Sequence, residues 1–200
     1  IWLRADVAVN LRGDYGNVLF TYLTGARLRA GHVDAPDGGA RYRHWLTHPV
    51  TYRADIHETE RCLDVVAAVG AGADGTHLEF PISPPAQEQA DRLLGSLGLV
   101  PEAPLVVIHP GGGWPLNWWP ADRFAALADW VTEARGAAVL LVGGPDEREL
   151  VNHVRRMTRY PIASLCGQTT LGVLGALLQR AALFVGNDGG PMHLAEAMDI

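Results

Sequence analysis

The second half of the chain alternates between short apolar runs and amphipathic segments, and this alternation constrains the fold more than any other feature. The pattern predicts strands at 105–109, 138–142, 162–165 and 182–186, with helices at 121–135, 146–157, 170–180 and from 191. Strands that alternate with helices form parallel sheets, because each helix provides the crossover to the next strand. We therefore predict an α/β fold with a parallel sheet that carries helices on both faces.

The first half of the chain is less regular. Its pattern predicts a strand around 6–11, a helix at 17–23, a polar loop at 31–49, and helices at 56–69 and 86–97. Prolines and glycines flank the last of these helices and indicate a break in the chain. We therefore predict two domains, residues 1–100 including an interdomain linker, and residues 101–200.

The junction between the last predicted strand and helix has the pattern of an anion-binding turn. Asn187 and Asp188 close the strand, and Gly189 and Gly190 can adopt backbone angles that other residues avoid, leaving no side chain in the way of a ligand. The helix that follows would favour a phosphate by roughly 0.3 to 2 kcal/mol through its dipole. The alternative is an ordinary turn, with His193 as a packed helix residue.

A second glycine-rich loop follows the apolar strand predicted at 105–109. Gly111, Gly112 and Gly113 are consecutive, and such a run permits close approach of the backbone to a ligand. Ligands of open α/β sheets bind at the carboxyl ends of the strands, where both loops fall. The alternative is a loop held in place by packing of its tryptophans at positions 114, 118 and 119.

Composition excludes several classes of function. The net charge is −6 and no basic stripe is present, so nucleic acid is not the expected partner. Cys62 and Cys166 lie far apart without metal-ligand spacing, which indicates a reduced cytosolic setting. No apolar run reaches about 18 residues and no signal peptide is visible, although peripheral contact with a membrane stays open. The fingerprint Gly-x-Gly-x-x-Gly of dinucleotide enzymes is missing.

Several blocks of the sequence resemble glycosyltransferase family 9, the heptosyltransferase-like family, in order and spacing. In the second half they are His109-Pro110-Gly111-Gly112-Gly113-Trp114-Pro115 through Trp119-Pro120, Val142-Gly143-Gly144-Pro145-Asp146-Glu147, Cys166-Gly167-Gln168-Thr169-Thr170-Leu171 and Gly186 to Ala195. In the first half they are Val9 to Asp14, Gly25-Ala26-Arg27 and His57 to Arg61. The similarity covers nearly the whole chain.

The resemblance implies a GT-B architecture, in which two Rossmann-like domains with parallel sheets flank a cleft. Residues 1–100 then correspond to the acceptor side and 101–200 to the donor side, both incomplete, so that the chain is an internal fragment. The implied reaction moves a sugar from a nucleotide-diphosphate donor, typically ADP-heptose, to lipopolysaccharide core without a metal or cofactor. The implied protein is a cytoplasmic monomer with possible peripheral contact at the inner membrane.

The resemblance also assigns residues to the donor's diphosphate. These are Gly111, Gly112, Gly113, Asn117, Asp188, Gly189, Gly190, Met192 and His193. We expect the amides of Gly190 and Met192 and the side chain of His193 to donate to its oxygens. Asp188 would repel phosphate, so we expect it to order the turn or to meet a sugar hydroxyl.

Other residues are assigned to the two ends of the reaction. For Asp146 and Glu147 the family suggests the nucleoside end of the donor, with helix capping by Asp146 as the alternative. Asp14, His57 and Arg61 are acceptor-side candidates. For the last two the alternative is a solvated helix face with a contact between Glu58 and Arg61. The family's general base is an aspartate upstream of Ile1, so no catalytic residue is assigned here.

Two positions depart from the family's pattern. Asn117 stands where the family usually has lysine, and Gly189 stands where it usually has serine or threonine. Loss of a charged contact to the diphosphate would cost about 1.5 to 3 kcal/mol. A catalytically weakened relative that acts as a nucleotide- or glycan-binding module is therefore the alternative function.

Overall fold

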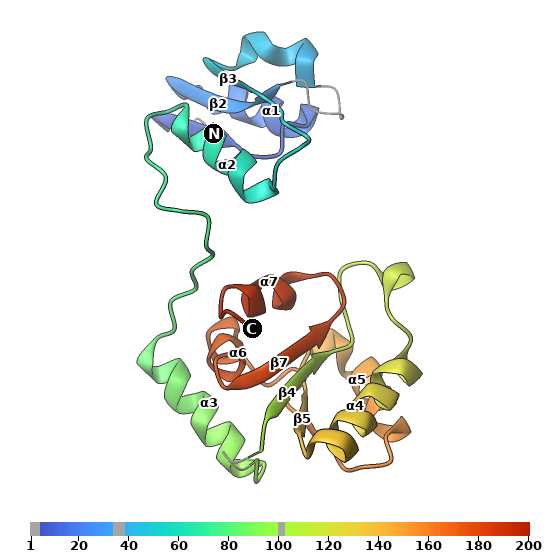
Figure 1. The fold of residues 1–200 in the computed structure, drawn as a ribbon. Helices are drawn as coiled ribbons and strands as arrows, with labels where there is room; N and C mark the ends of the chain where they lie inside the picture. The colour runs from blue at the N-terminus through green and yellow to red at the C-terminus, as the bar shows by residue number, and fades with distance from the viewer. Residues whose placement is uncertain (1–4, 34–38, 100–102) are drawn as a thin grey trace. The chain divides into compact units, whose positions relative to one another are not determined.

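A computed structural model describes residues 5–33, 39–99 and 103–200, which form two compact units that divide between Thr76 and His77 (Figure 1). The predicted division at residue 100 is therefore displaced. Helix α3 (Pro84–Ser96), which we assigned to the first domain and its linker, packs on the second unit. Two of its alanines, Ala86 and Ala90, are buried in that unit's core.

The first unit is a small parallel sheet with helices. Its elements are β1 (Val7–Asn10), α1 (Tyr15–Leu23), β2 (Leu28–Val33), the 3-10 helix η1 (Gly39–Trp45), β3 (His48–Thr51) and α2 (Glu58–Ala67). The strands lie in the order β1-β2-β3 and both pairs are parallel. Val18, Val33 and Leu46 form its buried cluster.

The loop predicted at 31–49 is wrong, because it contains the end of β2 and the start of β3. Polar Arg29 and His32 interrupt the apolar pattern of β2, and Pro49 lies within β3. Proline is tolerated in a strand that pairs on one side only, which is the position of β3 among the described strands.

The second unit confirms the predicted alternation of strands and helices. After α3 it contains β4 (Leu105–His109), η2 (Pro115–Asn117), α4 (Ala121–Arg135), β5 (Ala138–Leu141), η3 (Pro145–Glu147), α5 (Arg148–Met157), β6 (Ala163–Ser164), α6 (Leu171–Leu178), β7 (Ala181–Gly186) and α7 (Gly190–Glu196). All strand pairs are parallel. The helix predicted from 146 begins instead at Arg148, because a 3-10 turn precedes it.

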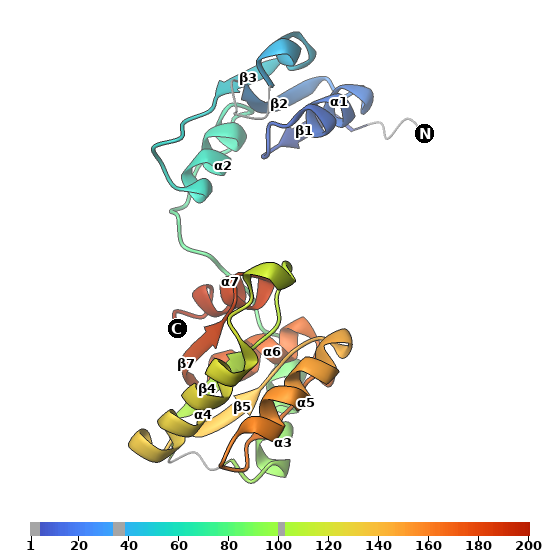
Figure 2. The same ribbon diagram turned by 90° about the vertical axis from the view of Figure 1, so that its right-hand side faces the viewer.

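Helices cover both faces of this sheet, as predicted. Val107 and Leu140 belong to the cluster that includes residues of α3, α6 and α7. Val106 and Val139 point the other way, into the cluster with α4 and α5, which lie together on one side of the sheet in Figure 2. Successive strand residues alternate between the faces, so a strand covered on both faces is apolar throughout.

The strand order places a topological switch point beside β4. The sheet runs β6-β5-β4-β7, so the chain adds β5 and then β6 on one side of β4 and later returns to add β7 on the other. Loops that leave neighbouring strands in opposite directions open a crevice at the carboxyl ends. The functional site is therefore expected between the loops that follow β4 and β7.

Candidate functional site

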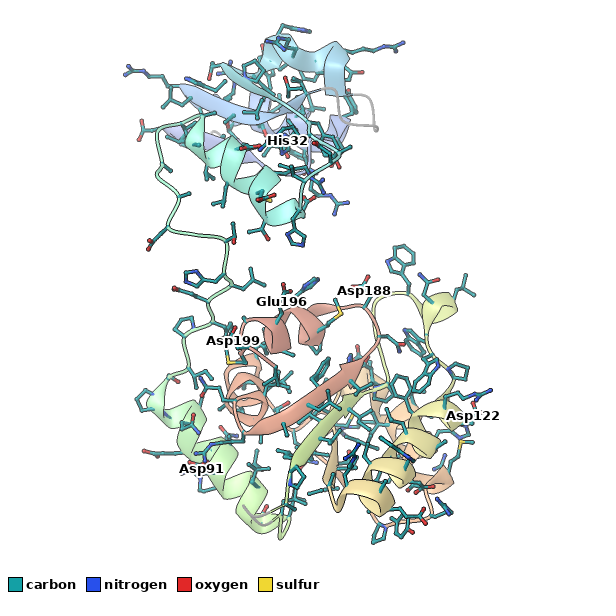
Figure 3. The ribbon with its side chains drawn as sticks, viewed as in Figure 1. His32, Asp91, Asp122, Asp188, Glu196 and Asp199 are labelled. Atoms are coloured by element: carbon teal, nitrogen blue, oxygen red, sulfur yellow. The ribbon has the colours of Figure 1, made fainter. Side chains whose placement is uncertain are left out.

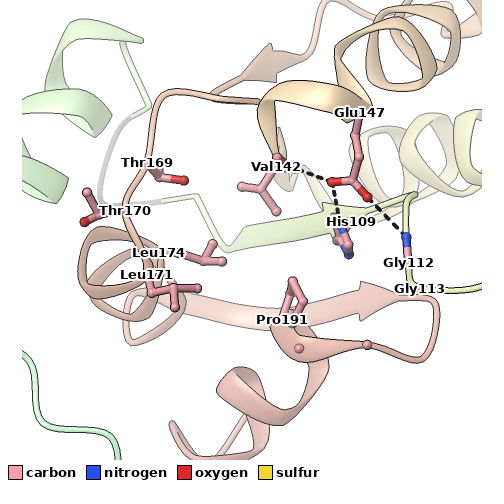
Figure 4. Close-up of a pocket in the computed structure, with 14 residues that line it drawn as sticks. His109, Gly112, Gly113, Val142, Glu147, Thr169, Thr170, Leu171, Leu174 and Pro191 are labelled. Atoms are coloured by element: carbon pink, nitrogen blue, oxygen red, sulfur yellow. Dashed lines mark hydrogen bonds and ion pairs between the residues drawn. The ribbon is translucent and has the colours of Figure 1, made fainter. Parts of the chain in front are cut away.

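A pocket of about 320 Å³ lies at this switch point, at the carboxyl ends of the strands (Figure 4). The loops that follow all four strands of the second sheet contribute to its walls. The lining includes Gly112 and Gly113 after β4, Gly144 and Glu147 after β5, Thr169 and Thr170 after β6, and Gly189, Gly190 and Pro191 after β7. The two glycine-rich loops singled out in the sequence therefore face the same pocket.

Glu147 joins the first two of these loops. Its Oε2 lies 2.9 Å from His109 Nε2 and accepts from the amide of Gly144 at 2.6 Å, and its Oε1 accepts from the amide of Gly112 at 3.2 Å. The His109 side chain is 4% exposed and that of Glu147 20% exposed. The contacts to His109 and Gly112 are dashed in Figure 4. A single carboxylate thus fixes the loop after β4 against the turn after β5.

The same contacts set the charge state of this carboxylate. Burial alone would raise the pKa of Glu147, but the hydrogen bonds from His109, Gly144 and Gly112 outweigh it and hold the pKa below the usual range. Glu147 is therefore ionised at neutral pH, and it contributes a negative charge to the pocket wall.

The loop after β4 needs glycine at two positions. A Cβ on Gly111 would overlap the carboxylate of Glu147. Gly112 has φ +154°, and a Cβ there would lie 3.2 Å from the carbonyl oxygen of Asp188. The three glycines therefore have different surroundings. Gly111 lies against the carboxylate of Glu147, Gly112 lies against the β7 loop at the pocket wall, and Gly113 lines the pocket with open space around it.

The expectation of unusual backbone angles at Gly189 and Gly190 is wrong. Gly189 has φ 166°, which is extended backbone, and Gly190 begins α7. A Cβ on Gly190 would meet nothing within 4 Å, and one on Gly189 would lie 3.8 Å from its nearest neighbour. These glycines instead leave open space at the pocket wall.

Asn187 ties the β7 loop to the β4 loop. Its Nδ2 donates to the carbonyl oxygens of Pro110 at 2.7 Å and Gly111 at 2.9 Å, and its Oδ1 accepts from the amide of Trp119 at 2.8 Å. Trp118 adds a bond from Nε1 to the carbonyl oxygen of Gly112 at 3.1 Å. The alternative of a loop held by tryptophans is therefore correct in part, but the tie from β7 is an asparagine.

Other predicted diphosphate residues lie outside the pocket lining. The amide of Met192 donates to the carbonyl oxygen of Gly189 at 3.0 Å, so the expectation that it is free for a ligand is wrong. His193 Nδ1 lies 3.5 Å from Glu196 Oε2 with a 61% exposed side chain, so it is not a packed helix residue either. Asn117 in η2 is exposed, as is Asp188 at the turn before α7 (Figure 3).

The nucleoside-side pair separates in the same way. Glu147 lines the pocket, whereas Asp146 is exposed and lies outside its lining. The capping alternative for Asp146 is wrong, because Glu147 is the residue that accepts from the amide of Gly144 at the start of this turn.

The acceptor-side candidates of the first unit have local structural roles. Asp14 caps α1 by accepting from the amide of Asn17 at 3.0 Å, and hydrogen bonds from Asn17 lower the pKa of Asp14. His57 caps α2, its Nδ1 accepting from the amide of Thr59 at 3.3 Å.

Arg61 contacts Glu58, with Nε 2.9 Å from Oε2, so the predicted contact is confirmed. The surface is not fully solvated, however. The side chain of Arg61 is 13% exposed, its guanidinium lies 4.9 Å from the ring centre of Tyr52, and it donates to the carbonyl oxygen of Ile56 at 2.8 Å.

Sequence reasoning assigned no site role to several residues that the structure places at strand ends. His109 ends β4, and Thr169 and Thr170 lie in the loop after β6. All three fall inside the sequence blocks that resemble the family, and this was the available signal. In the first unit Asn10 and His32 are buried at the ends of β1 and β2, and neither ring nitrogen of His32 has a described partner (Figure 3). No cluster of metal-ligating side chains occurs within residues 5–33, 39–99 and 103–200.

Comparison with solved structures defines the class of fold. A glycosyltransferase of family 9 from Veillonella parvula is similar with a TM-score of 0.80 and 24% identity, over 98% of this chain and 55% of that one. E. coli ADP-heptose lipopolysaccharide heptosyltransferase II is similar with a TM-score of 0.70 and 20% identity, over 98% of this chain and 60% of that one. The parallel α/β units thus have the GT-B type of fold.

The chain belongs to glycosyltransferase family 9 (heptosyltransferase), whose family model matches residues 3–200. It is 28% identical over 199 residues to lipopolysaccharide heptosyltransferase 3 of Escherichia coli. This match covers 98% of the present chain and 57% of the relative. The chain therefore spans little more than half the length of this relative.

Proposed function

We propose that the protein is a glycosyltransferase that moves a sugar, a heptose, from an ADP-linked donor to lipopolysaccharide core or another cell-surface glycan. The observation that carries the proposal is the pocket at the switch point, where two glycine-rich loops and Glu147 meet in a chain of this family. A relative of the same fold is described as an ADP-heptose lipopolysaccharide heptosyltransferase. The reaction is proposed to invert the sugar and to need no metal.

The pocket suggests how a nucleotide diphosphate is bound. Gly113 and Gly190 bring the backbone to the pocket wall without side chains. The amide of Gly190, the first residue of α7, has no intrahelical acceptor and can donate to a ligand. We assign the diphosphate to these two loops. Glu147 Oε1 accepts a single described hydrogen bond, so one lone pair remains for a ribose hydroxyl. We therefore assign the nucleoside to the β5 side of the pocket, and the second unit to the donor.

Calorimetric titration of the full chain with ADP, GDP and UDP tests this assignment. We expect ADP to bind preferentially at micromolar concentration, and the absence of binding by any of the three nucleotides would overturn the donor site. The substitution Asn117→Lys restores the family's charge and is expected to tighten ADP binding. Leu116→Lys adds the same charge at the neighbouring position, which is 99% exposed, and serves as the matched control.

The second candidate function is a weakened family member that binds nucleotide or glycan as a recognition module. The observation that favours it is Asn117, an uncharged side chain that is exposed and outside the pocket lining. A transfer assay with ADP-heptose and deacylated core oligosaccharide separates the two functions. Product formation supports the enzyme, and ADP binding without any product supports the module.

We further propose that the first unit contributes to the acceptor side and that the protein works as a cytoplasmic monomer at the inner membrane face. In the part of the chain that the structure describes, no helix is long and apolar enough to cross a membrane. A lipid-linked acceptor would require peripheral contact instead. Co-sedimentation of the full chain with anionic vesicles tests this contact.

A further inference from the structure

A second polar pocket lies on the other side of the turn that carries Glu147. It has a volume of about 320 Å³ and is lined by Arg148, Asn152 and Arg155 of α5 together with Ser164, Cys166 and Gln168 of the edge strand and its following loop. Glu147 and Arg148 are neighbours, but the first lines the donor pocket and the second lines this one.

The spacing on α5 directs both arginines to the same pocket. Residues 148, 152 and 155 are separated by four and three positions, which places them on one face of a helix. The guanidinium of Arg148 is held in place, because its Nη2 donates to the carbonyl oxygen of Gly167 at 3.3 Å. A Cβ on Gly167, which has φ +67°, would lie 2.8 Å from Arg148 Nε, so glycine makes room for this contact.

The charge of this pocket is not balanced by its own lining. No carboxylate is among the lining residues, and within the described ranges neither Arg148 nor Arg155 has a carboxylate oxygen within 4.0 Å. By contrast, Arg159 just beyond α5 pairs with Asp129 and Glu133. Cys166 at the floor donates its thiol to the carbonyl oxygen of Gly144 at 3.1 Å, and burial raises the pKa of this thiol.

We propose that this pocket, hereafter the α5 pocket, binds a phosphate group, either as free phosphate or as the phosphate of an ester. The two guanidinium groups each present a planar fork of N–H donors that matches the oxygens of a phosphate. Their positive charge favours this anion over a neutral ligand. The amide and hydroxyl side chains of Asn152, Ser164 and Gln168 complete the ring of hydrogen-bonding groups. The pocket is separate from the donor site, so its occupant is a second anion and not the donor's diphosphate.

The test is a titration of the full chain with inorganic phosphate at constant ionic strength, followed by backbone amide resonances. We expect the amides of Gly167 and Gln168 to shift, whereas Gly112 and Gly190 report any phosphate in the donor pocket. Shifts confined to the donor pocket, or no shifts up to about 50 mM phosphate, would overturn the α5 pocket. The ionic strength must stay constant, because added salt screens the attraction between phosphate and exposed arginines and would itself weaken binding.

Arg155→Gln is the decisive variant. The guanidinium of Arg155 makes no described ion pair, so its removal should not cost the fold a contact of this kind. Loss of one charged contact is expected to weaken phosphate binding roughly 10-fold or more. Arg156→Gln changes the same charge on the next residue, which is exposed and outside the pocket, and is expected to alter binding less than about 2-fold. Equal effects of the two variants would show non-specific attraction and refute the proposal.

A parallel titration with glycerol 2-phosphate separates the two sources of the phosphate group. Arg155-dependent binding of both compounds indicates a site that accepts phosphate esters, and binding of inorganic phosphate alone indicates a site for the free anion. The donor-site assignment is tested independently by ADP binding, which Arg155→Gln should leave unchanged. Failure of one proposal therefore does not affect the other.

Discussion

Replacement of Glu147 by glutamine tests whether one carboxylate holds the donor pocket together. The substitution conserves the shape of the side chain but replaces its carboxylate with a neutral amide. The carboxylate accepts three hydrogen bonds, from His109 and from the amides of Gly144 and Gly112. The single oxygen of the new amide cannot satisfy donors on both sides, so an NH₂ group would face at least one N–H donor. Both loops should loosen as a result.

The size of the effect follows from these contacts. Hydrogen bonds to a charged group contribute about 1.5 to 3 kcal/mol and neutral ones about 0.5 to 1.5, a difference of about 1 to 1.5 kcal/mol for each bond, so three weakened bonds give a loss of about 3 to 4.5 kcal/mol. The lower end is expected, because the side chain is 20% exposed and water can reach it. Chemical denaturation measures the free energy of unfolding, and titration with ADP measures the affinity of the pocket for the nucleotide.

The control and the pH dependence sharpen this prediction. Asp146→Asn removes the same charge from the neighbouring exposed side chain, and it should change stability by less than about 0.5 kcal/mol. Because folding lowers the pKa of Glu147, its contribution is complete at pH 7 and is lost as the pH falls from about 4.3 through the lowered pKa of the folded state. If Glu147→Gln unfolds like Asp146→Asn at pH 7, the reasoning is wrong.

Three further predictions concern the same unit. Gly111→Ala should reduce the free energy of unfolding by about 2 kcal/mol or more and abolish ADP binding, because the new Cβ would overlap the carboxylate of Glu147. Gly113→Ala is the control and should retain the stability of the native protein, because a Cβ at that position meets nothing within 4 Å. Asn187→Asp should destabilise by about 2 to 4 kcal/mol in denaturation curves, since a carboxylate oxygen would face two carbonyl oxygens. Asp129→Asn should reduce the free energy of unfolding by about 1 to 3 kcal/mol, because this buried residue, 6% exposed, accepts from two amides and a guanidinium just after α5. A loss of stability below about 0.3 kcal/mol would contradict a structural role for its charge.

The sequence was informative where local pattern and tertiary environment agree. Strands buried on both faces, such as β4 and β5, are continuous apolar runs, so their positions and the parallel sheet could be predicted from the order of residues along the chain. In the first unit the loop predicted at 31–49 covers the end of β2, which contains His32, and the start of β3, which contains Pro49. These strands form through pairing with their neighbours, which local propensity does not encode.

The boundary between the units was misplaced for a similar reason. A proline-rich segment before α3 reads as a linker, but the helix it precedes packs its alanines against α6. Whether a helix belongs to the domain before it or after it depends on which core buries its apolar face. That information lies in contacts between residues distant in sequence.

The sequence by itself determined that this chain is an α/β protein with glycine-rich loops at the carboxyl ends of two strands, because period, turn residues and family blocks are local properties. Only the tertiary structure decided which residues of those loops meet. It brings Glu147 of the turn after β5 together with His109 and Gly112 of the β4 segment, and it places His193 beside Glu196, outside the pocket lining. Side-chain direction and burial arise when the strands are ordered into a sheet, so spacing along the chain cannot supply them.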